Sequence, residues 1–327
     1  MKAIEVEHLS KVYPGGIKAV DDISFDVEEG EVWGFLGPNG AGKTTTIRMI
    51  ITLGLPTSGS IKVFGIDVSR DSARVRSMLG YVPQAVSVDG DLTAYENLLI
   101  FSKLFDVKKA DRPDRIKEAL DYMGLSERAD DLVKHFSGGM MRRLEIAESL
   151  VNRPKILFLD EPSIGLDPAS RLKTWGYIKK LNSEYGVTIF ITTHDMEEAD
   201  ELCDRLAIMN QGKIAVSGAP EDLKRSIGGD LVTVKTSARP PSTVPADLGT
   251  VTEVEDYSLK ILTANGEAAL PQIIDYLRNQ GVAIKGISLS TPSLDDVFMK
   301  YTSAGRDTRG SFRETREARK AFERRAR

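Results

Sequence analysis

Hydrophobic and polar residues alternate along the first part of the chain and then give way to longer apolar runs. AIEVEHLS (3–10) and ISFDVEEG (23–30) alternate with a period of two, which predicts half-exposed strands. EVWGFLG (31–37) is almost continuously apolar and ends in glycine, as expected of a strand buried on both faces. KTTTIRMIITLG (43–54) follows at once with helical character. The succession of strand, glycine loop and helix predicts the start of a βαβ unit.

The pattern turns helical from about residue 87 to residue 153, after one more strand at GSIKVFG (59–65). Buried strands then return at KILFLD (155–160) and VTIFITTH (187–194). The stretch between them, residues 168–186, is predicted to be a helix. We therefore expect a sheet that resumes after a helical insertion.

The first domain is predicted to close with a β-hairpin, RLAIMNQGKIAVSG (205–218), with Gln211 and Gly212 at its turn. The character of the sequence changes after Gly228 and Gly229. The first domain is accordingly placed at residues 1–228, with its helical subdomain at about 85–153.

Residues 229–303 are predicted to form a small α+β domain of two strands, a helix and a third strand. Pro271 is expected to interrupt the helix near its start. The four segments are DLVTVKT (230–236), SLKILT (258–263), EAALPQIIDYLRNQG (267–281) and VAIKGISLST (282–291). Residues 304–327 form a charged and mostly basic tail.

Composition narrows the class of protein. At 327 residues and a formal net charge of −4, the chain resembles an ordinary soluble globular protein without a nucleic-acid footprint, so no nucleic-acid partner is expected. Cys203 is the only cysteine, which excludes an intrachain disulfide and fits a reducing compartment. The N-terminus has no signal-peptide core, and no window approaches the roughly 20 apolar residues that cross a bilayer. If the protein acts at a membrane, another chain must supply the spans.

Residues 37–44 match the phosphate-loop pattern G-x-x-x-x-G-K-[ST] in full. The matching residues are Gly37, Pro38, Asn39, Gly40, Ala41, Gly42, Lys43 and Thr44. Glycines let backbone N–H groups point at phosphate oxygens, and the following helix adds its positive end. Lys43 is predicted to reach the β- and γ-phosphates, and Thr44 to offer a hydroxyl to Mg²⁺. The alternative is a plain glycine turn. Such a turn would not have to lie between a buried strand and a helix, as this one does.

Further candidates follow the predicted strands. Asp160 and Glu161 end a buried strand, at the sheet edge where ligands of α/β proteins bind. Asp160 suits Mg²⁺, and Glu161 suits a general base that polarises water; the alternative is a pair of turn-capping carboxylates. His194 ends the next strand as a γ-phosphate ligand or an ordinary polar group. Gln84 either orders Mg²⁺ and water or is a loop residue, and Tyr13 either stacks on adenine or simply ends a strand.

FSGGM (136–140) has the features of a second anion site. Ser137 and the N–H groups of Gly138 and Gly139 stand at the predicted N-terminus of a helix. The segment lacks a lysine and a nearby metal-binding carboxylate. It is therefore a poor ATP site alone.

The order of these parts resembles the nucleotide-binding subunit of ABC transporters over about residues 2–225. The fold class implied is α/β: a P-loop NTPase core of the ABC-ATPase type with antiparallel β and helical subdomains, plus the small α+β domain. The matching elements are the aromatic loop at Tyr13, the Walker A loop from Gly37 to Thr45, the Q-loop at Gln84, the signature from Ser137 to Met140, the Walker B motif at Asp160 and Glu161, the D-loop from Ser163 to Asp167 and the switch histidine His194.

This resemblance implies that two subunits, identical or different, close head to tail around two ATP molecules. Ser137, Gly138 and Gly139 would then bind the γ-phosphate held by the other subunit, and Asp167 would join the nucleotide site. Mg²⁺ would lie on Thr44, Asp160 and Gln84, and catalysis would depend on Glu161, His194 and Gln84. The usual signature reads LSGGQ. Phe136 keeps an apolar anchor, whereas Met140 loses an amide, so we expect a looser but working dimer.

TPSLDDVFMKYT (291–302) resembles the end of the drug-resistance exporter ATPases of the daunorubicin type, whose signature often reads SGGM. That branch implies a peripheral subunit on the cytoplasmic face of the cell membrane. It would drive export of a drug, lipid or other hydrophobic cargo through a separate integral membrane permease. An ordinary amphipathic helix capped by Ser293 is the alternative reading of this segment.

Two rival functions stay open on the sequence alone. One is a soluble ABC ATPase without a permease, although such proteins usually carry two cassettes or long coiled-coil insertions. The other is a regulatory sensor that binds ATP and hardly hydrolyses it. Glu161 argues against a sensor.

Overall fold

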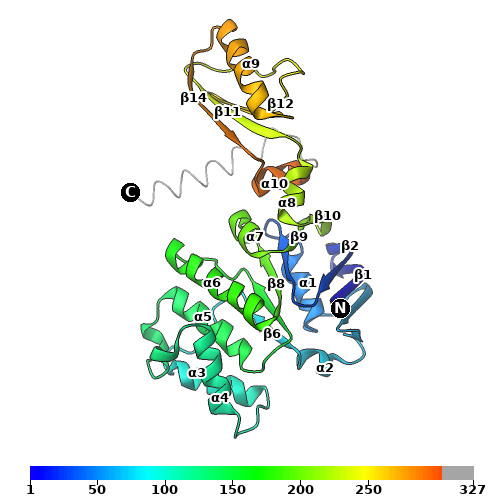
Figure 1. Ribbon diagram of the computed structural model, residues 1–327. Coiled ribbons are helices and arrows are strands. Elements are labelled where there is room, and N and C mark those ends of the chain that lie inside the picture. Colours follow the sequence, from blue (N-terminus) through cyan, green and yellow to red (C-terminus); the bar gives the residue numbers. More distant parts are fainter. Residues whose placement is uncertain (304–327) are drawn as a thin grey trace. The chain divides into compact units, whose positions relative to one another are not determined.

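The computed structural model describes residues 1–303, shown as a ribbon in Figure 1. The chain divides into two compact units, one from Met1 to Pro220 and one that begins at Glu221. The predicted boundary at residues 228 and 229 follows helix α8 (Pro220–Ser226). Across the described residues, every helix is too short or too polar to pass through a lipid bilayer. The predicted basic tail, 304–327, lies outside the described residues.

The first unit contains an antiparallel sheet with the strand order β2-β1-β4-β5. Its alternation has a simple cause, because Ile4, Val6 and Leu9 of β1 are buried while Glu5, Glu7 and His8 between them are half-buried or exposed. The strands are β1 (Lys2–Tyr13), β2 (Ile17–Glu28), β4 (Ser58–Val63) and β5 (Ile66–Asp67).

The central sheet of the first unit has the order β10-β9-β3-β8-β7-β6, and all its neighbouring pairs are parallel except β9 and β10. Every residue of β3, β7 and β8 is buried, which explains their unbroken apolar runs. Gln211 and Gly212, at φ 50° and 79°, turn the predicted hairpin. The strands are β3 (Val32–Leu36), β6 (Leu79–Val82), β7 (Ile156–Asp160), β8 (Thr188–Thr193), β9 (Arg205–Asn210) and β10 (Lys213–Gly218).

Helices α3, α4 and α5 pack on one another and form the predicted helical subdomain (Figure 1). Thr93 and Glu96 close a capping box at the start of α3, so this helix begins where side chain and backbone satisfy each other. The helices of the first unit are α1 (Lys43–Ile50), α2 (Ser72–Arg76), α3 (Ala94–Leu104), α4 (Arg112–Tyr122), α5 (Gly138–Leu150), α6 (Pro168–Tyr185) and α7 (Met196–Leu202), with short 3-10 turns at Ser126–Arg128 and Val133–His135.

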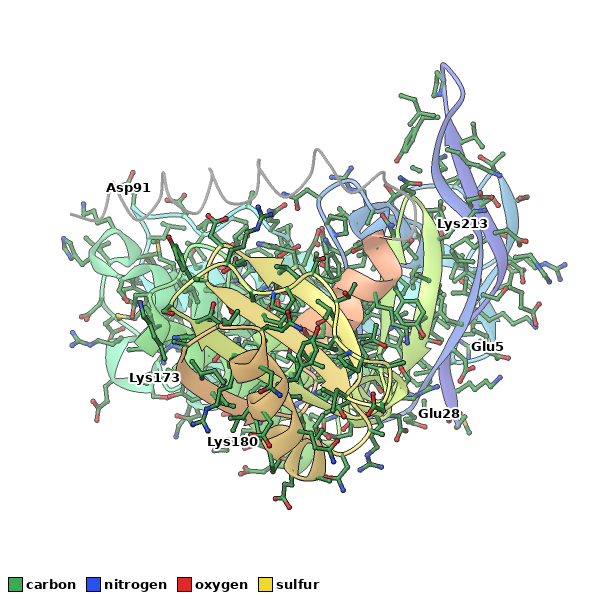
Figure 2. The ribbon with its side chains drawn as sticks, turned by 90° about the horizontal axis from the view of Figure 1, so that it is seen from above. Glu5, Glu28, Asp91, Lys173, Lys180 and Lys213 are labelled. Carbon is green, nitrogen blue, oxygen red and sulfur yellow. The ribbon has the colours of Figure 1, made fainter. Side chains whose placement is uncertain are left out.

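Helix α6 forms where a helix was predicted, and it buries one side. Trp175, Ile178 and Leu181 are buried. Lys173 and Lys180 are exposed, and in Figure 2 their side chains extend away from the ribbon. The helix therefore covers the core with one side and carries exposed lysines on the other.

The second unit is an α+β domain with an antiparallel sheet of order β12-β13-β11-β14. Helix α9 lies on one face of this sheet, with Ile273 packed in the same core as Val232 and Ile261. Ser293 caps α10, because its hydroxyl accepts from the N–H of Asp296 at 3.3 Å. The elements are β11 (Asp230–Thr236), β12 (Thr250–Glu255), β13 (Ser258–Thr263), α9 (Gly266–Asn279), β14 (Ile284–Ser290) and α10 (Leu294–Ser303).

Two expectations about this unit are wrong. Strand β12 was not predicted; it is an edge strand whose residues are half-buried or exposed, so its apolar signal is weak. Pro271 does not interrupt α9, which runs through it from Gly266 to Asn279. The proline is exposed, so its ring faces solvent and the buried side of the helix continues.

Cys203 lies in the core of the first unit and is buried against β3. A Cβ atom added at Gly34 would come within 2.5 Å of its Sγ, so the strand needs glycine there. Burial raises the pKa of the Cys203 thiol well above its usual range.

Candidate nucleotide site

The phosphate loop connects β3 to α1, and its shape depends on glycine. Gly40 and Gly42 have φ values of 82° and 106°, in the left-handed region that favours glycine. A Cβ at Gly37 would lie 2.4 Å from the carbonyl oxygen of Met209. No side chain caps the N-terminus of α1 at Gly42, so its backbone N–H groups are available to a phosphate. Pro38 and Asn39 at the tip are exposed and can be reached by a ligand.

Lys43 is held in the mouth of this loop. Its side chain is only 5% exposed, and Nζ donates to the carbonyl oxygen of Gly37 at 2.6 Å. The same atom lies 3.3 Å from Oε1 of Glu161, so a buried ion pair joins the loop to the end of β7. The lysine is thus directed at the place where phosphate charge would enter.

Thr44 and Asp160 meet beside the lysine. The Thr44 hydroxyl donates to Oδ1 of Asp160 at 3.2 Å, and the Thr192 hydroxyl donates to the same oxygen. Thr45 is half-buried on the next position of α1. A hydroxyl and a carboxylate are hard oxygen donors, which are the ligands that Mg²⁺ prefers. This donor set fits a magnesium ion that completes its shell with water and phosphate oxygens.

Glu161 sits in an unusual backbone conformation at the edge of the sheet. Its φ of 52° is rare for a residue with a side chain, and such strain commonly marks functional positions. The backbone N–H donates to the carbonyl of Thr192 at 3.0 Å. Oε2 lies 2.7 Å from Nδ1 of His194, whose side chain is 48% exposed. The structure therefore brings the predicted base and the predicted switch histidine into direct contact.

Gln84 and Tyr13 are placed on the surface, apart from this cluster. Gln84 is exposed in the loop after β6, and no hydrogen bond within residues 1–303 joins it to Thr44 or Asp160. Tyr13 ends β1 and is 39% exposed, with the Lys11 ammonium 5.3 Å from its ring centroid. Both side chains are open to a ligand, but neither is brought to the metal-binding oxygens.

The signature segment forms the predicted helix N-terminus. The Ser137 hydroxyl accepts from the N–H of Met140 at 3.3 Å and caps α5. Ser137 and Gly138 are exposed, whereas Phe136 is buried as an anchor. A Cβ at Gly139 would come within 2.6 Å of Cβ of Ser170, so helix α6 requires glycine there.

The D-loop follows Glu161 in the chain and leads into α6. Asp167 caps α6 by accepting from the N–H groups of Ala169 and Ser170 at 3.1 and 3.0 Å. Its hydrogen bonds with Ser170 hold the pKa of Asp167 below its usual value. A pocket of about 200 Å³ opens here, lined by Glu161, Ser163, Ile164, Gly165, Leu166, Arg171, Thr193, His194, Asp195 and Glu198.

Two groups of this site were missed from the sequence. Thr192 donates to Asp160, and Arg142 of α5 donates to the carbonyl oxygens of Asp160 and Glu161 at 3.0 and 3.2 Å. Arg142 is only 4% exposed. Thr192 lies in an apolar strand and Arg142 in a helix rich in charged residues. Nothing in the local sequence distinguishes either residue from its neighbours as part of the site.

Comparison with known families agrees with this geometry. Residues 20–164 match the family described as ABC transporter, and residues 218–302 match the C-terminal domain of DrrA1-3-like ATP-binding proteins. The chain belongs to the ABC transporter family and carries a DrrA-like C-terminal domain. It is an ABC-type ATPase, so the predictions of family, fold class and ATP as substrate are confirmed.

Several curated relatives are similar along almost the whole chain. The daunorubicin/doxorubicin resistance ATP-binding protein DrrA of Streptomyces peucetius is 39% identical over 321 residues, 95% of each chain. The linearmycin resistance ATP-binding protein LnrL of Bacillus subtilis (strain 168) is 34% identical, covering 91% of this chain and 98% of the relative. The Nod factor export ATP-binding protein I of Sinorhizobium fredii (strain NBRC 101917 / NGR234) is 38% identical, covering 92% and 86%.

Solved structures of other proteins resemble about two thirds of the chain. CbiO1 from Clostridium perfringens, part of the ABC transporter complex cbiONQ, has a TM-score of 0.64 and 29% identity, covering 68% of this chain and 90% of that one. The dimeric structure of MJ0796, a bacterial ABC transporter cassette, has a TM-score of 0.59 and 29% identity, covering 66% and 98%. The predicted ABC core is therefore confirmed at the level of fold.

Proposed function

We propose that this ATPase is the energy-supplying subunit of an exporter for drugs, lipids or other hydrophobic cargo. It would act on a separate integral membrane permease from the cytoplasmic face of the membrane. Relatives named as drug-resistance and Nod factor export proteins support this proposal, because they resemble both units of the chain. Exposed apolar residues on and near the helical subdomain offer a surface for a permease helix: Leu53, Leu55, Val86, Ile100 and Leu104.

The proposal includes a head-to-tail dimer of two copies or of this chain with a close relative. One observation carries it: the N-terminus of α5 at Ser137 is exposed, while the phosphate loop has its own lysine and carboxylates. An anion-binding helix end without a cation of its own fits the γ-phosphate bound by a second subunit. The MJ0796 cassette, which is described as dimeric, supports the pairing of two subunits.

In this proposal the residues of the site divide the chemistry among them. Lys43 neutralises charge on the γ-phosphate, and Glu161 removes a proton from the attacking water. His194, 2.7 Å from Glu161, orients that carboxylate. Thr44 and Asp160 would hold Mg²⁺, with Gln84 closing on the ion; when bound, the metal neutralises phosphate charge. Tyr13 would stack on adenine, and Asp167 would place the D-loop at the dimer interface.

The decisive variant is Glu161→Gln. We expect turnover to fall by about 10²- to 10⁴-fold, because the amide cannot accept the proton, while ATP still brings two subunits together. ATPase assays and light scattering with ATP check both expectations. Glu197→Gln is the matched control, since Glu197 is an exposed glutamate paired with Arg171 at 2.9 Å.

Unchanged turnover in Glu161→Gln would remove this residue from catalysis. A monomer at high concentration with bound ATP would refute the dimer. Purification from membranes, with identification of the bound integral protein, separates an exporter subunit from a soluble ATPase without a permease. Slow wild-type turnover together with tight ATP binding would instead indicate a nucleotide sensor.

A further inference from the structure

Gln84 lies on a short exposed segment that is held at both ends by helix α5. At one end, Nη1 of Arg142 donates to the carbonyl oxygen of Pro83 at 2.7 Å. At the other, Oε1 of Glu145 accepts from the N–H of Ser87 at 2.6 Å and from its hydroxyl at 3.1 Å. Residues 84–86 between these anchors are exposed. The position of Gln84 is therefore set by what holds the ends of its loop.

The two anchors are themselves a buried ion pair. Arg142 and Glu145 lie 3.0 Å apart and are only 4% and 2% exposed. Such a pair is favourable only where hydrogen bonds satisfy its remaining donors and acceptors. Here Ser87 of the loop donates twice to Oε1 of Glu145 and Arg142 donates to Oε2, so both carboxylate oxygens have partners and the buried charges are compensated.

The same guanidinium also holds the catalytic edge of the sheet. Its nitrogens donate to the carbonyl oxygens of Asp160, Glu161 and Pro162 at 3.0, 3.2 and 2.9 Å. One side chain thus joins the glutamine loop to the strand end that carries the metal-binding and base carboxylates. Both Arg142 and Glu145 belong to α5, whose N-cap is Ser137.

We propose that Arg142 and Glu145 are positioning residues for ATP hydrolysis, which make the glutamine loop, the Walker B end and the signature helix one rigid unit. Glu145 determines where Gln84 stands relative to Asp160. Helix α5 passes any shift of that loop to Ser137, which precedes Arg142 by about 7.5 Å and Glu145 by about 12 Å along the helix axis. The residues proposed to hold Mg²⁺ at one nucleotide are thereby linked to Ser137, which in the proposed dimer contacts the second nucleotide. The functional part of this inference rests on the proposed role of Gln84 toward Mg²⁺.

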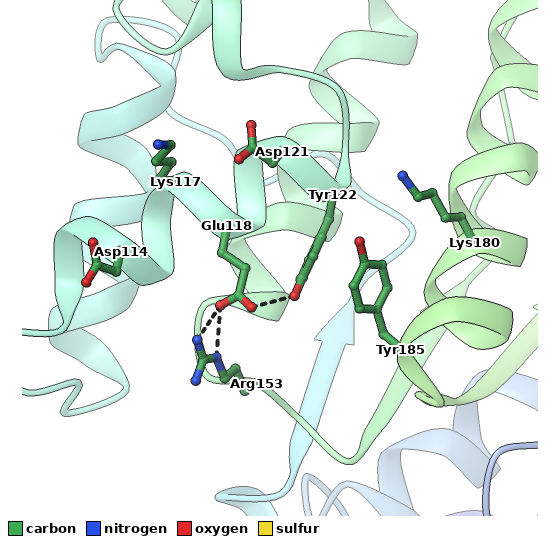
Figure 3. A pocket seen from close by; sticks show the side chains of 8 residues that line it. All are labelled: Asp114, Lys117, Glu118, Asp121, Tyr122, Arg153, Lys180 and Tyr185. Carbon is green, nitrogen blue, oxygen red and sulfur yellow. Dashed lines mark hydrogen bonds and ion pairs between the residues drawn. The ribbon is translucent and has the colours of Figure 1, made fainter.

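Glu145→Gln tests the clamp with the shape of the side chain preserved. The control is Glu118→Gln on α4. Glu118 accepts from Arg153 at 2.9 and 2.6 Å and from Tyr122 (Figure 3), beside a separate pocket of about 470 Å³. Both substitutions remove one glutamate charge from an arginine partner in the helical subdomain, and only the first touches the glutamine loop.

The first measurement is amide hydrogen exchange of the peptide that contains Ser87, without nucleotide. We expect exchange about tenfold faster or more in Glu145→Gln and unchanged exchange in Glu118→Gln, because only the former weakens the acceptor of the Ser87 amide. The second is ATPase activity titrated with Mg²⁺. We expect the half-saturating Mg²⁺ concentration to rise about 10- to 100-fold in Glu145→Gln, with the KM for ATP far less affected.

Ser87→Pro repeats the test with Glu145 and α5 intact, because it deletes the amide donor at an exposed position. Unchanged exchange in Glu145→Gln overturns the clamp. Faster exchange in Glu145→Gln, together with a wild-type Mg²⁺ dependence of the ATPase activity in both Glu145→Gln and Ser87→Pro, overturns the positioning role. Gln84→Ala is measured in the same assay. A wild-type Mg²⁺ dependence in this variant would refute the proposed role of Gln84. The hydrogen-exchange result would still test whether Glu145 holds the loop, because it does not depend on that role.

Discussion

Glu148 is a buried carboxyl that the site does not use. It lies on α5 with 2% of its surface exposed, and its Oε1 has no hydrogen-bond partner among residues 1–303. Burial, and to a smaller extent the charge of Glu145, raises the pKa of Glu148 from 4.5 to about 8. The folded state therefore binds a proton that the unfolded state releases between these two values. Its contribution to the free energy of unfolding is greatest below pH 4.5 and is lost as the pH rises toward 8.

Glu148→Gln should remove this pH dependence, because the amide resembles the protonated acid and cannot ionise. We expect the variant to be more stable than the wild type by about 1–3 kcal/mol at pH 8 and similar to it at about pH 4.5. Urea unfolding across this range measures the difference. Glu184→Gln, at an exposed site 3.7 Å from Lys180, is the control. A constant difference between Glu148→Gln and wild type at every pH would contradict the argument.

The residues at the sheet edge were predictable, and those beneath it were not. Thr44, Asp160 and Glu161 follow buried segments whose ends must meet at one edge, so the sequence placed them together and the structure agrees. Their catalytic roles stay predictions. Arg142 and Glu145 occupy a helix rich in charge, where such residues usually face solvent. Only the packed position of α5 shows that both are buried.

At the scale of elements, the strongly periodic or fully apolar segments were predicted and the marginal ones were missed. Strand β12 gains its structure from pairing with β13, where Glu253 lies opposite Lys260 at 2.8 Å. A strand that depends on its neighbour has no strong pattern of its own. Helix α9 continues through Pro271 because Ile273 and Leu277 beyond it are buried in the domain core.

Pro271→Ala should therefore stabilise the second unit. Alanine restores the N–H that proline lacks and removes the clash of the ring with the preceding turn, which together cost up to about 3 kcal/mol inside a helix. We expect a gain of about 1–3 kcal/mol in the unfolding free energy of this unit, read by calorimetry of the full chain. Gln272→Ala, at the next exposed position, is the control. Equal transitions for Pro271→Ala and wild type would show that the helix already accommodates the ring without strain.

At the scale of the whole molecule, the proposed dimer divides each site between two chains. Lys43 would belong to one half of a site and Ser137 to the other. Lys43→Met and Ser137→Arg should each abolish ATP hydrolysis alone. In an equal mixture, half of the dimers would be mixed and each would keep one intact site, so about a quarter of the wild-type activity should return.

Mixing Lys43→Met with Glu161→Gln is the matched control. Lys43 and Glu161 lie 3.3 Å apart in one chain, so no mixed dimer of these two variants has an intact site. Activity in the control mixture, or none in the test mixture, would contradict a site completed by the other subunit. ATPase assays across the mixing ratio provide the measurement.

The Cys203 thiol, which packs against Gly34, can be used to measure opening of the first unit. Because it is sealed inside the first unit and its thiolate is scarce, a thiol-reactive dye reaches Cys203 only when the surrounding sheet opens. The rate at which the dye modifies Cys203 then measures how often the central sheet opens. Cysteines introduced on the surface, for spectroscopic labels on the moving parts of the cycle, can be modified without replacing the native one.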